Sequence, residues 1–101
     1  MGERALAQAE ALRSGDYEAA LQFMTPSYQA SPRARDYQRN RAGAAGWTSV
    51  DLKWVRCDEI GTSCDVRLII RAVRPPVTNT PLPIPLDDVW ILVDGEWYQY
   101  E

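Results

Sequence analysis

Two cysteines, Cys57 and Cys64, are the most reactive side chains of this 101-residue sequence, which contains no histidine. They flank the turn-like stretch Glu59–Thr62. If the neighbouring segments form an antiparallel hairpin, the two Cα atoms lie roughly 5 Å apart, a distance that allows a disulfide. Two buried free thiols are the alternative, because cysteine is common on apolar faces. A zinc site needs further thiol or histidine ligands, so we expect no metal.

Tyrosines beside carboxylates are the second group that could do chemistry. Asp16 precedes Tyr17 and Asp36 precedes Tyr37, and a tyrosine next to an acid can polarise a carbonyl group. Each also has an ordinary role, because Asp16 can cap a helix and tyrosine rings fill cores while their hydroxyls stay hydrated. We therefore assign no catalytic residue. The aromatic residues that could line a pocket are Tyr17, Tyr28, Tyr37, Trp54 and Tyr98.

The cysteines must be positioned by a β-hairpin that we predict over Val50–Val73. The second strand alternates cleanly, with one apolar face made by Cys64, Val66, Leu68, Ile70 and Ala72. In the first strand Cys57 is out of phase with the preceding apolar residues. A β-bulge at Val55–Arg56 restores the phase. It predicts the pairs Trp54–Val66, Leu52–Leu68 and Val50–Ile70.

Helices precede this hairpin. We predict a first helix over Glu3–Arg13, which Ser14-Gly15 ends, and a second over Tyr17–Met24, which Asp16 caps. A short turn follows at Thr25–Tyr28. A basic helix then starts at Ser31-Pro32. The arginines at 33, 35, 39 and 41 spread around the last helix, so we interpret it as solvated. The net charge of −3 also argues against a nucleic-acid or anionic-membrane partner.

The segment Arg74–Leu86 carries five prolines, at positions 75, 76, 81, 83 and 85. Proline donates no ladder hydrogen bond, so this segment cannot be a central strand. We predict an edge with Leu82, Ile84 and Leu86 turned inward. A polyproline ligand for a recognition domain is the alternative.

A second hairpin closes the sequence at Asp88–Glu101, because Asp94-Gly95 favours a two-residue turn. One face carries Val89, Ile91, Tyr98 and Tyr100, and the other carries Trp90, Leu92 and Trp97. The helices can cover only one of these apolar faces. The other is either a partner surface or is buried by sheet curvature. We expect Trp90, Leu92 and Trp97 to contribute to self-association.

Three stretches resemble a known family: Leu12–Tyr17, Thr25–Tyr28 and Val89–Tyr98 are similar to the nuclear-transport-factor-two-like (ketosteroid-isomerase-like, cystatin-like) superfamily, in particular its small bacterial members. The resemblance implies one α+β domain over residues 1–101, with N-terminal helices packed on a strongly bent antiparallel sheet. It also implies a cone-shaped pocket and frequent homodimerisation through the sheet.

Enzymes of this superfamily place Asp, His or Tyr inside the cone. The inward face predicted for the central hairpin has no carboxylate, since Asp51 and Asp65 point the other way. No catalytic residue of those enzymes can therefore be transferred to a matching position in this sequence.

These observations favour a non-catalytic cell-envelope domain for binding or assembly. The alternatives are a carrier of a small apolar ligand and an isomerase-like or cyclase-like enzyme that uses the cone. The sequence contains no Gly-rich phosphate loop, nucleophile elbow or paired-carboxylate motif, so we expect no cofactor. No apolar run could span a bilayer and no signal peptide is visible. A disulfide would favour the periplasm, where a lipoprotein anchor is one arrangement, whereas free thiols fit the cytoplasm.

Overall fold

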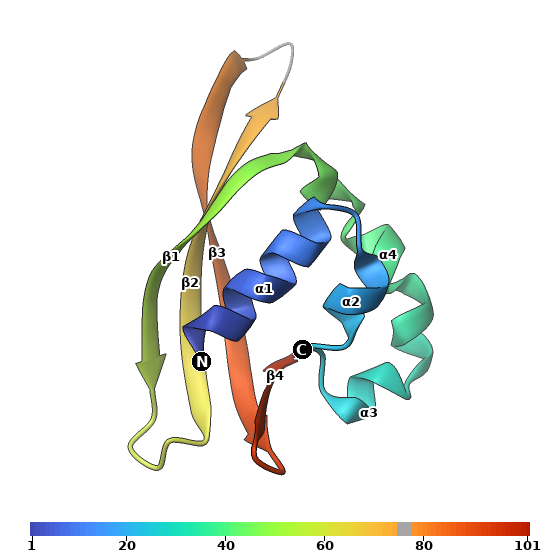
Figure 1. Ribbon diagram of the computed structural model, residues 1–101, viewed down its shortest axis with the longest axis vertical. Helices are drawn as coiled ribbons and strands as arrows, with labels where there is room; N and C mark the ends of the chain where they lie inside the picture. Colours follow the sequence, from blue (N-terminus) through green and yellow to red (C-terminus); the bar gives the residue numbers. More distant parts are fainter. Residues whose placement is uncertain (75–77) are drawn as a thin grey trace.

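The computed structural model describes residues 1–74 and 78–101 and has helices followed by an antiparallel sheet (Figure 1). The helical segments are α1 (Gly2–Arg13), α2 (Tyr17–Leu21), α3 (Pro26–Gln29), the 3₁₀ turn η1 (Pro32–Asp36), α4 (Tyr37–Asn40) and the 3₁₀ turn η2 (Ala42–Gly46). The strands are β1 (Trp47–Cys57), β2 (Ser63–Arg74), β3 (Thr78–Val93) and β4 (Glu96–Tyr100), in the order β1-β2-β3-β4. The predicted α+β class is therefore confirmed.

The helix α1 lies against one face of the sheet, and the shorter helices gather beyond β4 (Figure 1). Among the residues described, no helix has both the length and the apolar character that a membrane crossing requires. As predicted, α1 ends at Ser14-Gly15 and the Asp16 carboxylate caps α2, accepting a hydrogen bond from the Ala19 N–H at 3.1 Å.

The second helix stops at Leu21 and not at Met24, because the residues after it pair with the edge of β4. The Gln99 N–H donates to the Phe23 carbonyl at 2.7 Å, and the Thr25 N–H donates to the Gln99 carbonyl at 3.2 Å. This short extended segment covers the outer edge of β4. It also buries Met24 completely.

The basic segment that starts at Pro32 is not one helix but the series η1, α4 and η2. Burial of Tyr37 beside Tyr28 directs this path, with ring centroids 6.2 Å apart in an edge-to-face pair. The two glycines of η2 also have low helix propensity. The expectation of a solvated face is wrong for Arg41, whose side chain is only 17% exposed.

The central hairpin forms, and Cys57 pairs with Cys64 in a disulfide, as predicted. On its apolar side the β2 residues Cys64, Val66, Leu68 and Ile70 are buried, whereas Leu52 and Cys57 of β1 are exposed. The predicted pairs Val50–Ile70 and Leu52–Leu68 are present. The bulge, however, lies between Leu52 and Trp54 and not at Val55–Arg56.

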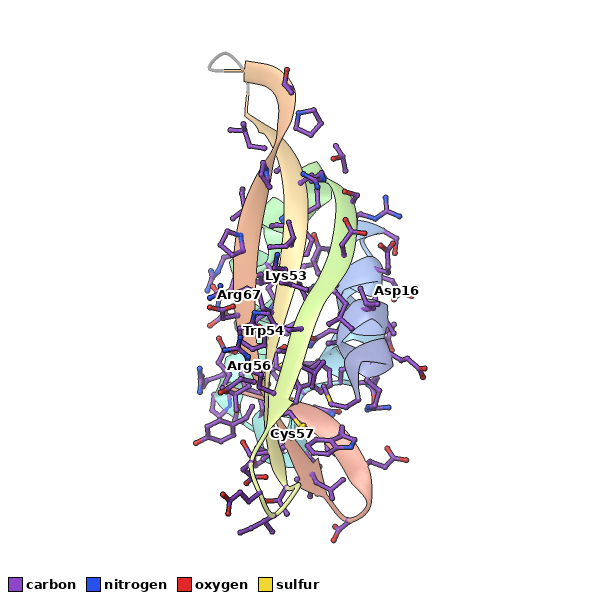
Figure 2. All side chains as sticks on the ribbon, turned by 90° about the vertical axis from the view of Figure 1, so that its left-hand side faces the viewer. Asp16, Lys53, Trp54, Arg56, Cys57 and Arg67 are labelled. Carbon is purple, nitrogen blue, oxygen red and sulfur yellow. A yellow bond between two sulfur atoms is a disulfide. The ribbon has the colours of Figure 1, made fainter. Side chains whose placement is uncertain are left out.

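This earlier bulge reverses Trp54. Val55 now lies opposite Val66, and Trp54 lies opposite Arg67 on the outer face of the sheet. The reason is the close approach of α1: a methyl group added to Gly2 would lie 3.3 Å from a Val55 methyl carbon. An indole ring at the position of Val55 would collide with the start of the helix. Figure 2 shows Trp54 with Arg56 and Arg67 on the side of the sheet away from α1.

The proline-rich segment is the first half of β3, and within the described residues β2 is the one strand that pairs with it, because β4 begins to pair at Val89. It is an edge strand, as predicted, and not a polyproline helix. The described prolines at 81, 83 and 85 are exposed, whereas Ile84 and Leu86 are half-buried. Leu82 is 42% exposed, so the expectation that it packs inward is wrong. Pro75 and Pro76 lie outside the described residues.

The closing hairpin has the predicted register, from Val93 opposite Glu96 to Val89 opposite Tyr100. Asp94 and Gly95 have φ angles of 50° and 84°, as a two-residue primed turn requires. Within residues 1–74 and 78–101, the core divides into two clusters of buried residues. One lies among the helices and contains Leu12, Ala20, Met24, Tyr28, Tyr37 and Ala44, and the other joins α1 to the sheet through Ala5, Ala9, Val66, Leu68 and Trp90.

The opposite placement of two tryptophans predicts different costs for their removal. Trp90 is completely buried, so Trp90→Ala should destabilise the fold by about 4 kcal/mol through loss of packing. Trp54→Ala should cost less than half as much, because its ring lies on the outer face against two arginines. Urea unfolding monitored by circular dichroism measures both, with Trp90→Leu as a milder core variant. Equal losses for Trp54→Ala and Trp90→Ala would contradict the observed register.

Candidate functional site

A cavity of about 440 Å³ lies between α1, the segment around η2 and the inner face of β2, β3 and β4. Its walls combine six apolar side chains with six polar ones. The lining residues are Gln8, Ala9, Leu12, Asn40, Arg41, Gly43, Ala44, Trp47, Leu68, Leu86, Asp88, Gln99 and Glu101. Small-molecule sites commonly combine an apolar wall with convergent polar groups, and this cavity has both, with a larger polar share than is usual.

Asp88 is the central polar residue of this cavity. It lies on β3 between Leu86 and Trp90, which share its face of the strand, and its Oδ1 accepts a hydrogen bond from the Gln99 amide at 3.1 Å. Burial raises the pKa of the Asp88 carboxyl to about 6, although the nearby Arg41 guanidinium acts in the opposite direction. Asp88 therefore changes its charge close to neutral pH.

Asp88 was not among the predicted site residues. The carboxylates considered were Asp16 and Asp36 beside tyrosines and Asp51 and Asp65 on the central hairpin, and Asp88 was expected only to begin the closing hairpin. The signal that could have found it is the alternation of Leu86, Asp88 and Trp90 along one continuous strand, since residues two apart share a face.

Arg41 is the cation of the cavity, but its charge is already engaged. Its Nη2 donates to Glu101 Oε2 at 2.7 Å, and its guanidinium carbon lies 4.3 Å from the centre of the Tyr37 ring. Above pH 6 the three charged lining residues, two acids and one base, therefore sum to −1. The cavity disfavours an additional anion.

Gln8 contributes a buried amide to the same cavity. Its Nε2 donates to the Tyr37 hydroxyl at 3.3 Å, and burial raises the pKa of that phenol to about 12, so Tyr37 stays protonated. The carbonyl oxygen of Gln8 accepts no hydrogen bond from any residue within 1–74 or 78–101. Among the described residues, the acceptors left free in the cavity are this carbonyl and the second Asp88 oxygen, and the side-chain amide of Asn40 adds a free donor at its exposed rim.

The five aromatic residues predicted to line a pocket do not meet in one. Tyr28 and Tyr37 are buried core residues, and Tyr17 packs on the same cluster. Trp54 lies on the outer face, and Tyr98 lines a separate groove. The proposed tyrosine–acid pairs are not used either: Asp16 caps a helix and Asp36 forms an ion pair with Arg39 at 2.6 Å.

The three residues predicted for self-association have different environments. Trp90 has no exposed surface, so sheet curvature and the helices bury it. Trp97 is half-buried against the same core, and Leu92 is 38% exposed. The opposite face of the hairpin exposes Val89 and Tyr100 instead. Homodimerisation through the sheet stays a prediction.

Comparisons with known proteins found similarity at the level of structure. No protein-family model and no curated protein matches the sequence. The chain is similar to a crystal structure titled as a candidate NTF2-like transpeptidase from Campylobacter jejuni, with a TM-score of 0.75 and 13% identity over 99% of this chain and 96% of that one. It is also similar to a designed NTF2-like protein, with a TM-score of 0.68 and 13% identity over 97% and 90% of the two chains.

A third similar structure is a SEC-C motif containing protein from Rhodopseudomonas palustris, with a TM-score of 0.66 and 18% identity over 91% of this chain and 68% of that one. Together these similarities show that the chain has the NTF2-like, that is nuclear-transport-factor-two-like, fold that its motifs predicted.

The raised pKa of Asp88 predicts a pH-dependent stability. Between about pH 4 and pH 6 the folded state keeps a proton that the unfolded state releases, so stability falls as the pH rises through this window. Asp88→Asn keeps an oxygen acceptor for Gln99 and removes the charge. It should be on the order of 2 kcal/mol more stable than the natural chain at pH 7.5 and equally stable at pH 4.

Thermal unfolding at the two pH values measures this difference. The matched control is Asp87→Asn, one residue earlier, because Asp87 is exposed and its pKa is lowered by a hydrogen bond to Arg67. That variant should gain no stability at pH 7.5. A destabilised Asp88→Asn at pH 7.5 would contradict a buried carboxylate in this cavity.

Proposed function

We propose that this chain is a non-catalytic binding domain whose cavity holds a small, partly apolar molecule with a cationic or N–H-bearing end. The observation that carries the proposal is the half-buried carboxylate of Asp88, which faces apolar walls and has one oxygen free. A ligand with a donor at one end and a hydrocarbon or aromatic body satisfies both parts of this site.

The size and the charge of the cavity support this class of ligand. A volume of about 440 Å³ falls within the usual range for small-molecule pockets. A positively charged ligand would form an ion pair with the ionised Asp88. This pairing would offset part of the free-energy cost of burying the carboxylate. An anionic ligand would first have to displace Glu101 from Arg41.

Proton transfer by an isomerase-like enzyme is the second candidate, and the raised pKa of Asp88 favours it, because a general base works best near the ambient pH. Such a reaction also needs a donor that stabilises the developing negative charge. The Tyr37 hydroxyl does not line the cavity, Arg41 is paired with Glu101, and the Asn40 amide belongs to an exposed residue that water reaches. Binding without catalysis therefore fits the arrangement better.

We further propose that the domain works outside the cytoplasm, as an accessory part of a cell-envelope protein. The Cys57–Cys64 disulfide supports this location, because such bonds persist in oxidising compartments. To test this location, the protein is isolated from its native cells and treated with an alkylating reagent without prior reduction. Mass spectrometry should then find no alkyl label on either cysteine, because a disulfide does not react with the reagent. Two labelled thiols would argue for the cytoplasm.

Three probes of one shape test the ligand class: benzylamine, benzyl alcohol and benzoate. At pH 7.5 we expect benzylamine to bind most tightly and benzoate most weakly, because only the amine pairs with ionised Asp88. Two-dimensional NMR titration measures binding through the amide signals of Leu68, Leu86 and Asp88. Asp88→Asn should remove the preference for the amine, whereas Asp87→Asn should retain it. Equal binding of all three probes would contradict the proposed site.

A further inference from the structure

A second groove, of about 680 Å³, lies at the edge of β4 and shares no lining residue with the Asp88 cavity. The start of α1, the segment from α2 to α3 and the beginning of β4 form it. Its lining residues are Arg4, Gln22, Phe23, Pro26, Gln29, Ala30, Glu96 and Tyr98. The groove therefore combines one cation, one carboxylate, two amides and an apolar surface.

Arg4 is held in a fixed orientation by three contacts. Its Nε donates to the Trp97 carbonyl at 2.6 Å, and its guanidinium carbon lies 4.8 Å from the centre of the Phe23 ring and 5.7 Å from that of Tyr98. Aromatic faces on a guanidinium favour this geometry. Because the side chain is already ordered, a ligand that binds it loses less conformational entropy.

The remaining donors of Arg4 are free. Arginine has five N–H groups, and only the Nε–H is used within the part of the chain that the structure describes. No carboxylate in that part lies within ion-pair distance of Arg4. Glu96 lines the same groove, but its Oε2 lies 3.5 Å from the Tyr98 hydroxyl. The half-buried Arg4 guanidinium is therefore oriented and ready to bind an anion.

The rest of the groove narrows the class of anion. A single cation with Glu96 nearby suits a monoanion better than a phosphate dianion. The planar fork of arginine matches a carboxylate, with two parallel hydrogen bonds. The Gln29 amide N–H₂ donates to the Met24 carbonyl at 2.8 Å and to the Gln22 carbonyl at 3.3 Å, so its own oxygen is left as an acceptor.

We propose that this groove binds the α-carboxylate of an acylated amino acid or of a peptide C-terminus. Arg4 forms the bidentate pair with the carboxylate, and the Gln29 oxygen accepts the adjacent amide N–H. Phe23, Pro26 and Ala30 receive the apolar side chain. The proposal is independent of Asp88 and of the function proposed for the other cavity.

N-acetyl-leucine is the probe, and N-acetyl-leucinamide, which lacks the charge, is its matched control. NMR titration of the Phe23 and Tyr98 backbone amide signals, which are present in every variant, should show saturable binding of the acid and none of the amide. Arg4→Lys keeps the charge without the fork and should weaken binding at least tenfold. Arg13→Lys, on the same helix and paired with Glu10, should change nothing. Glu96→Gln should strengthen binding, because it removes a like charge.

The tripeptide Ala-Ala-Leu, with a free or an amidated C-terminus, distinguishes the two sources of the carboxylate. If the tripeptide with a free C-terminus binds more tightly than N-acetyl-leucine, the groove is assigned to peptide C-termini. If this tripeptide binds more weakly than N-acetyl-leucine, the groove is assigned to single acylated amino acids. Equal shifts with N-acetyl-leucinamide, or an unchanged affinity in a folded Arg4→Lys protein, would overturn the proposal. Weaker binding by Glu96→Gln would also overturn it, because Glu96 would then be the binding group.

Discussion

The close packing of α1 on the inner face of the sheet is the contact on which the rest of this structure depends. Small residues make it close: Ala5 and Ala9 contribute to the cluster with Val66 and Leu68, and Gly2 lies against β1. Because the start of the helix lies so near β1, the bulge moves to Lys53 and Trp54 turns outward. Farther along α1, Gln8, Ala9 and Leu12 line the Asp88 cavity.

Local signals predicted much of the fold. The Asp94-Gly95 turn set the register of the closing hairpin, the cysteine spacing set the end of the central one, and Asp16 marked a helix start. These features depend on neighbours in sequence. The position of the bulge depends instead on how near α1 lies, which only the packed structure shows. For the same reason the break in the basic helix, which buries Tyr37, could not be predicted from spacing.

The candidate site was the least predictable part, because it is formed by residues far apart in sequence. Asp88 on β3, Gln8 on α1 and Arg41 after α4 meet only when the sheet bends under the helices. Burying an ionised carboxylate lowers the stability of a fold, and the raised pKa of the half-buried Asp88 shows that this residue carries such a penalty. Proteins retain such strained or costly groups most often where function requires them. Arg4 in the second groove shows the complementary case, an oriented cation that has no carboxylate within ion-pair distance in residues 1–74 and 78–101.

The pKa of Asp88, measured from its carboxyl carbon signal during an NMR pH titration with and without benzylamine, tests the central claim most directly. The structure predicts a value near 6 in the free protein, because the carboxyl is desolvated in the cavity. Bound amine should lower that value, since a neighbouring positive charge favours the ionised form. An ordinary aspartate pKa near 4, or a raised one that benzylamine leaves unchanged, would contradict the account of this cavity as a binding site.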